Sequence, residues 1–148
     1  MKSPPEKLSR TLELLASIED RSERIQLLID TALRYEPVPR EIAVRPYPED
    51  RKVPGCESQV YVWGEDLPDG TLRFHFAVEN PQGVSARALA VLLQETLSAA
   101  PLDEVAAVSP DIIYSIFGNE LSMGKSLGLT GVVQIVVALA KKKAARAS

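Results

Sequence analysis

The chain of 148 residues has a single cysteine, Cys56, and a single histidine, His75. One cysteine excludes an internal disulfide, and the absence of a Cys-x-x-Cys pair or a Cys/His cluster leaves no ligand set for zinc or an iron-sulfur cluster. A scaffold that holds a cluster is also disfavoured, because it normally needs several thiolates. We therefore expect no metal and no cofactor, and a reducing compartment, the cytoplasm, fits best.

The sequence also lacks a strong excess of charge and an apolar leader. Its net charge of -3 gives no overall attraction to nucleic acid or to an anionic membrane. Residues 1–6 contain no apolar signal region, and no stretch is expected to reach the roughly 18 apolar residues of a spanning helix. We expect neither nucleic acid nor a membrane among the partners.

What the sequence does contain is typical of a globular protein. Hydrophobic residues make up 45% and charged residues 25%, which is enough for one substantial core, so a single domain over residues 1–148 is predicted. Helical spacing of apolar residues predicts two amphipathic helices, over 8–18 and 25–33, packed as a hairpin. A capping box at Ser3 and Glu6 should begin the first, and Asp20 should begin the second.

The middle of the chain indicates a connector followed by a small sheet. Five prolines between residues 37 and 54 exclude a helix there. Alternating patterns from Ser58 to Trp63 and from Leu72 to Val78, with Asp69-Gly70 between them, then predict a β-hairpin. His75 falls on the polar side of the second strand, and we expect it to be solvated rather than paired with the cysteine.

Helical patterns dominate the remainder of the chain. They predict a helix from Val84 to Leu97 that covers the sheet, two short helices after Pro101 and Ser109, and a buried helix over 131–140. The predicted fold class is α+β, a small antiparallel sheet packed against helices.

Cys56 lies at the tip of a loop between the connector and the hairpin. Gly55 permits a bend that other residues resist, and Pro54 stiffens the approach. A lone cysteine can be a small buried hydrophobe, but polar neighbours and a loop position favour chemistry. Basic residues of the connector could favour the thiolate if one reaches the sulfur, whereas Glu57 would oppose it.

Residues 55–61, GCESQVY, resemble the motif Gly-Cys-x-Ser-Gln-Val-aromatic of the SufE family. The resemblance implies a fold like that of SufE and the IscU-type scaffold proteins. It also implies that Cys56 accepts persulfide sulfur from a SufS-like cysteine desulfurase, stimulates that enzyme, and passes the sulfur to a SufBCD-like iron-sulfur scaffold complex. Gly55, Ser58 and Gln59 would then belong to the binding site around the sulfur.

A second stretch, residues 121–129, is similar in frame to the family pattern Leu-Thr-Pro-Ser-Arg-x-x-Gly-Leu. Lys125 stands where the family has arginine, which implies a place for Lys125 on the partner-facing surface. Met123 and Gly124 replace Pro-Ser, and residues 79–81 replace the family's Ser-Asp-Ala. A lysine is a point charge and cannot reproduce a bidentate arginine contact.

Three functions remain open at this point: a sulfur carrier, for iron-sulfur assembly or for another sulfur-transfer pathway, an interaction module that uses a groove near Trp63, and a thiol enzyme. The enzyme would need a general base or a resolving thiol near Cys56, and the sequence indicates neither. A carrier needs one thiol, and it should shield that thiol from oxidants until a partner binds. Val53, Val60 and Val62 provide the apolar residues for this shielding.

Overall fold

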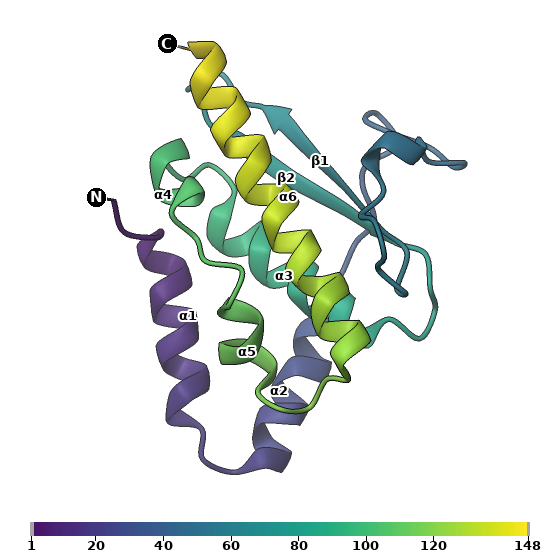
Figure 1. Cartoon of the computed structure of the whole chain (residues 1–148), viewed down its shortest axis with the longest axis vertical. Coiled ribbons are helices and arrows are strands. Elements are labelled where there is room, and N and C mark those ends of the chain that lie inside the picture. The colour runs from purple at the N-terminus through teal and green to yellow at the C-terminus, as the bar shows by residue number, and fades with distance from the viewer. Residues whose placement is uncertain (1, 148) are drawn as a thin grey trace.

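The computed structural model describes residues 2–147 (Figure 1). This part of the chain forms six α-helices, one 3-10 turn and one two-stranded antiparallel sheet, the α+β class that the sequence predicts. The elements are α1 (Glu6–Ser17), α2 (Arg21–Ala32), the 3-10 turn η1 (Glu49–Arg51), β1 (Val60–Asp66), β2 (Leu72–Val78), α3 (Val84–Leu97), α4 (Leu102–Ala106), α5 (Ile112–Phe117) and α6 (Met123–Ala147).

The first two helices differ from the prediction in detail. Helix α2 begins as expected, because the Asp20 side chain accepts a hydrogen bond from the Ser22 N–H at 2.8 Å. The predicted capping box at Ser3 is wrong: α1 begins at Glu6, and its N-cap residue is Pro5, which makes no side-chain cap bond. Both helices pack against α3, so α3 joins them rather than a direct helical hairpin.

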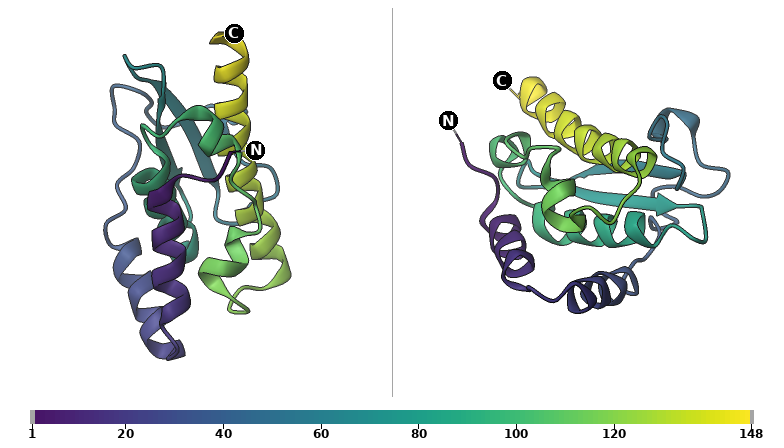
Figure 2. Two further views of the ribbon diagram at one scale, coloured as in Figure 1. Left: turned by 90° about the vertical axis from the view of Figure 1, so that its left-hand side faces the viewer. Right: turned by 60° about the horizontal axis from the view of Figure 1, so that its bottom comes forward.

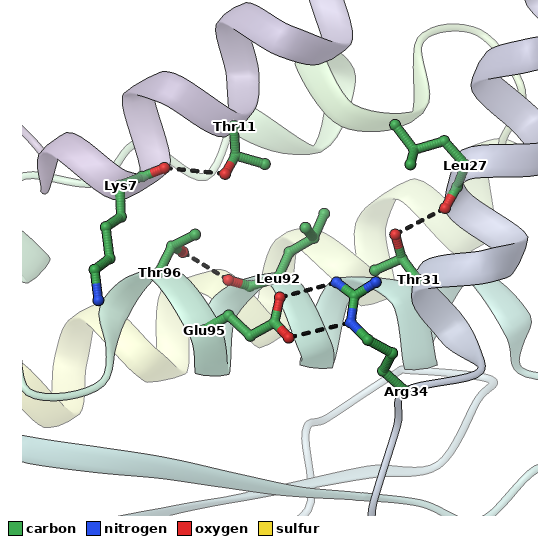
Figure 3. Close-up of polar contacts among 8 residues, drawn as sticks. All are labelled: Lys7, Thr11, Leu27, Thr31, Arg34, Leu92, Glu95 and Thr96. Carbon is green, nitrogen blue, oxygen red and sulfur yellow. Dashed lines mark hydrogen bonds and ion pairs between the residues drawn. The ribbon is translucent and has the colours of Figure 1, made fainter.

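Polar contacts fix the far end of α2 to α3 (Figure 3). The Arg34 Nη2 donates to Glu95 Oε1 at 2.9 Å, and its Nε donates to the other carboxylate oxygen at 3.2 Å. The hydroxyls of Thr11, Thr31 and Thr96 each donate to the carbonyl four residues earlier in their own helix. The ion pair is half exposed, so it orients the helices more than it stabilises the fold.

The predicted β-hairpin forms, but its first strand extends to Asp66, beyond the predicted end at Trp63. Val60 pairs with Val78, and Asp66 pairs with Leu72 next to the turn. Gly70, in this turn, has a φ of +88°, a conformation that favours glycine. The apolar residues of one face, Val62, Phe74 and Phe76 among them, enter the main core, where α3 packs on β2 and α6 on β1 (Figure 2).

The proline-rich connector covers the other face of the hairpin. The Val38 N–H donates to the Phe76 carbonyl at 2.9 Å, and Val38 packs with Tyr61, Trp63 and Ala77 in a second small core. Apart from the three-residue turn η1, the connector is free of helix, as its prolines predict.

This covering bears on the prediction that His75 is solvated, which is wrong. The sequence places His75 on the polar side of β2, but the connector packs on this side at Tyr61, Trp63 and Ala77, and the His75 residue is 6% exposed. Its Nε2 lies 2.9 Å from Glu65 Oε1, which supplies the polar partner that a buried imidazole needs.

Helix α6 is much longer than the predicted segment 131–140, and it crosses the front of the molecule in the view of Figure 1. By length and composition it could cross a membrane, which the sequence analysis did not anticipate. Its residues Val132, Val133 and Val136 are buried in the core that contains the hairpin and α3. In this fold α6 is therefore a core helix, which accounts for its apolar composition.

Candidate functional site

The loop that carries Cys56 is closed at its base by the backbone. The Val53 N–H donates to the Val60 carbonyl at 2.8 Å, and within the loop the Gln59 N–H donates to the Cys56 carbonyl at 3.1 Å. Gly55 has a φ of +70°, as its place in the predicted bend requires. Gln59 also adopts a positive φ, +54°, so the chain turns sharply on both sides of Cys56.

The segment that leads from β2 into α3 holds the other side of this loop. The Glu79 N–H donates to the Gln59 carbonyl at 3.1 Å, and the Asn80 N–H donates to the Ser58 carbonyl at 3.2 Å. The side-chain amide of Asn80 reaches the Glu57 carbonyl at 3.4 Å. The loop is thus an ordered part of the fold.

The Cys56 side chain points inward although the loop tip is at the surface. Pro54 and Gly55 are exposed, whereas Cys56 is 8% exposed and belongs to the main core. Val53 and Val60, both almost completely buried, lie on the two sides of the loop. The thiol is shielded in the free chain, as expected from the sequence.

Two cavities meet at Cys56. A wide, open cavity of about 600 Å³ is lined by Gly55, Cys56 and Gln59, with further residues of the connector and the loop. A small cavity of about 70 Å³ is lined by Cys56, Ser58 and Lys125, together with residues 82–85 at the start of α3. The structure therefore brings the predicted site residues to two sides of the thiol, and their roles in binding stay predictions.

Lys125 lies in a different part of the fold from the one expected. Lys125 lies in the first turn of α6 rather than ahead of the last helix, because α6 begins at Met123. Its side chain is exposed at the small cavity.

Burial raises the pKa of the Cys56 thiol, since the thiolate is poorly solvated in the core. Hydrogen bonds from the Ser58 and Val60 N–H groups lower it by a smaller amount, and the charge of Glu57 raises it further. The suggestion that connector cations hold Cys56 as a thiolate is wrong. One of those cations, Arg45, pairs with Glu79 at 2.8 Å instead.

A raised pKa has a measurable consequence. In the free folded protein, the pH profile of Cys56 alkylation should have its midpoint above that of the same chain in denaturant. The reason is that burial keeps the thiol protonated at pH values where the unfolded thiol has already ionised. Rates measured with one alkylating reagent between neutral and alkaline pH give both midpoints. A folded midpoint equal to or below the unfolded one would contradict this charge environment.

The sequence analysis missed Gly128, which faces Cys56 from α6. A Cβ built on Gly128 would lie 3.0 Å from the Cys56 Cα and 3.2 Å from its Sγ. Gly124 and Gly131 face the same loop. The spacing of four and three residues places these glycines on one helical face, a signal that the sequence contains.

The residues around Cys56 add few reactive groups to the thiol itself. Among the described residues that line the two cavities there is no histidine. Within residues 2–147, no group of three or more His, Cys, Asp or Glu side chains is placed to hold a metal ion. The arrangement is suited to reversible covalent chemistry on one sulfur atom.

Comparisons with known proteins concern the family and the fold of the chain. The model of the family described as "SufE: Fe-S metabolism associated domain" matches residues 9–140. The solution structure of a hypothetical protein from Thermus thermophilus is similar, with a TM-score of 0.77 and 26% identity, over 96% of this chain and 98% of that one. No curated protein matches the sequence.

Proposed function

Because the chain belongs to the SufE family, which is associated with iron-sulfur metabolism, we propose that Cys56 accepts sulfur from a cysteine desulfurase. One observation carries the proposal: the only cysteine of the chain lies in the family motif, at an ordered loop, buried between two cavities. The acceptor then delivers this sulfur to iron-sulfur cluster assembly. We place this activity in the cytoplasm.

The transfer is a thiol exchange. The Cys56 thiolate attacks the outer sulfur of the desulfurase persulfide, and a new S–S bond forms at Cys56 Sγ while the old S–S bond breaks. The desulfurase thiolate leaves with the electron pair of that bond and takes up the proton that Cys56 released. No net oxidation occurs, and the desulfurase is free for another turnover, so the acceptor stimulates it.

The absence of a second cysteine suits this role. A second thiol could attack the Cys56 persulfide, which would close an internal disulfide and release the cargo as sulfide. With one thiol, the persulfide persists until an external acceptor arrives. Burial then protects it from passing thiols and oxidants.

The surface around the thiol supports a partner that is partly apolar and partly acidic. Val84 lines the small cavity and is exposed, and Met123 and Leu127, which precede and follow Lys125 in the first two turns of α6, are exposed as well. Lys125 forms no ion pair within the described residues, so it is available for a carboxylate of the desulfurase.

Replacing Lys125 should weaken desulfurase binding. We expect Lys125→Ala to raise the dissociation constant up to about fivefold, the size of an exposed ion pair, and Lys125→Arg to keep most of the affinity. Lys141→Ala, at the exposed far end of α6, is the control. Titration of each variant by calorimetry measures the effect, and unchanged affinity in both Lys125 variants would remove Lys125 from the interface.

Intact-mass measurement tests the function. After incubation with a cysteine desulfurase and cysteine, the protein should gain the mass of sulfur, and a reducing thiol should remove it. If no such adduct forms with the desulfurase of the same cell, the carrier function is wrong.

A further inference from the structure

Gly128 occupies the point where α6 comes closest to the cysteine loop. A Cβ at this position would lie 3.0 Å from the Cys56 Cα, 3.2 Å from its Sγ and 3.3 Å from its Cβ. All three separations are tighter than ordinary van der Waals contact, and one of them involves a backbone atom. A side chain at residue 128 would require Cys56 itself to shift by a few tenths of an ångström.

The other two glycines of this helical face meet side-chain atoms of other residues. A Cβ on Gly124 would lie 3.2 Å from Glu57 Oε1, the end of a flexible and exposed side chain that can turn away. A Cβ on Gly131 would lie 3.2 Å from Val53 Cγ1. Of the three, only Gly128 touches the residue that carries the thiol.

The backbone of α6 does not itself require glycine at residue 128. The glycines of the described chain with positive φ are Gly55, Gly70 and Gly118, so Gly128 has a conformation open to any residue. Within a helix, glycine is less favourable than alanine by about 1 kcal/mol. The close approach of Cys56 is therefore the physical reason for a glycine at this position.

We propose that Gly128 is a positioning residue of the sulfur-acceptor site. Its lack of a side chain lets the Cys56 backbone lie directly on α6, which turns the thiol into the core. With a methyl group at residue 128, Cys56 has to shift away from α6 by a few tenths of an ångström, which loosens the packing that shields the thiol. The importance of Gly128 for sulfur transfer rests on the proposed function. Its effect on where the Cys56 thiol lies does not.

Alanine substitutions at Gly128 and Gly124 test the proposal as a matched pair. Both make the same chemical change in the same helix, and both should favour the helix, so the fold is expected to persist. We expect Gly128→Ala to speed alkylation of Cys56 at least tenfold and to move the midpoint of its pH profile down, toward that of the unfolded chain. Gly124→Ala should leave the alkylation rate within about twofold of the unchanged protein.

A Gly128→Ala protein that keeps its melting temperature and alkylates at the unchanged rate would overturn the proposal. If Gly128→Ala does not fold, the double variant with Cys56→Gly decides, because glycine removes the Sγ and Cβ that the methyl group meets and lets the backbone that carries the Cα move away. We expect the double variant to regain a cooperative thermal transition. If the double variant shows no cooperative transition, contact with Cys56 is not the reason why Gly128→Ala fails to fold.

These measurements need no desulfurase, which separates them from the test of function. An unchanged alkylation rate in Gly128→Ala refutes the positioning role and leaves sulfur acceptance standing. Absence of a sulfur adduct on the unchanged protein refutes acceptance and leaves the positioning role standing.

Discussion

Cys56→Ser will abolish the sulfur adduct that forms when the protein is incubated with a cysteine desulfurase and cysteine. Serine fits the space of cysteine, but its oxygen cannot hold a persulfide, and no other thiol exists in the chain. The stimulation of desulfurase turnover should be lost as well, because the exchange step that frees the enzyme thiol cannot occur. Intact mass and the rate of alanine production measure the two effects.

A relocated thiol is the matched control. Ser115 is exposed on α5, outside the cysteine loop, so Cys56→Ser combined with Ser115→Cys restores one thiol at a different place. We expect this double variant to gain little sulfur and to leave turnover unstimulated. An adduct on Cys56→Ser alone, or equal transfer to the relocated thiol, would show that the loop is not the acceptor.

The second large effect concerns access to the thiol. Alkylation of Cys56 in the free protein should be slower than that of an unhindered thiol by roughly 5- to 150-fold. This range corresponds to about 1 to 3 kcal/mol for turning out a thiol and one or two apolar neighbours. The closed loop, with Cys56 8% exposed beside the buried Val53 and Val60, is the physical cause.

Binding of the partner should remove most of this protection, because an interface can supply a free energy of that size. The test uses a desulfurase whose own catalytic cysteine is replaced, so that the alkylation measured is that of Cys56 and not that of the catalytic thiol. Alkylation should accelerate in this complex and in mild denaturant. Reaction of the free protein at the rate of an unhindered model thiol would contradict the shielded loop without removing Cys56 as the acceptor.

The parts of the fold with short-range signals could be predicted from the sequence. The Asp69-Gly70 turn and the alternating patterns beside it predict the hairpin, and Asp20 predicts the start of α2. The bend at Gly55 could be predicted for the same reason, since its cause lies in the residues next to it.

The predictions that were wrong depend on contacts between segments that lie far apart in the sequence. His75 is buried on the face of the sheet where a connector some thirty residues earlier packs, and local alternation carries no information about that cover. The pKa of Cys56 could not be predicted either. Burial in the core raises this pKa, and the N–H groups of Ser58 and Val60 lower it by a smaller amount. The sequence alone shows only the nearby charges.

Gly128 falls between these cases. Its spacing from Gly124 and Gly131 predicts one glycine face on a helix, but the partner of that face lies some seventy residues away, at Cys56. The sequence could indicate that something approaches α6 closely, and only the structure identifies it as the thiol.

Single-turnover transfer of labelled sulfur tests the central claim most directly. A desulfurase loaded with labelled persulfide is mixed with this protein without further cysteine, and the label is then followed by peptide mapping. We expect the label to leave the desulfurase and to appear on the peptide that contains Cys56, one sulfur atom for each one lost. Label that stays on the desulfurase, or that appears on peptides without Cys56, would contradict the account.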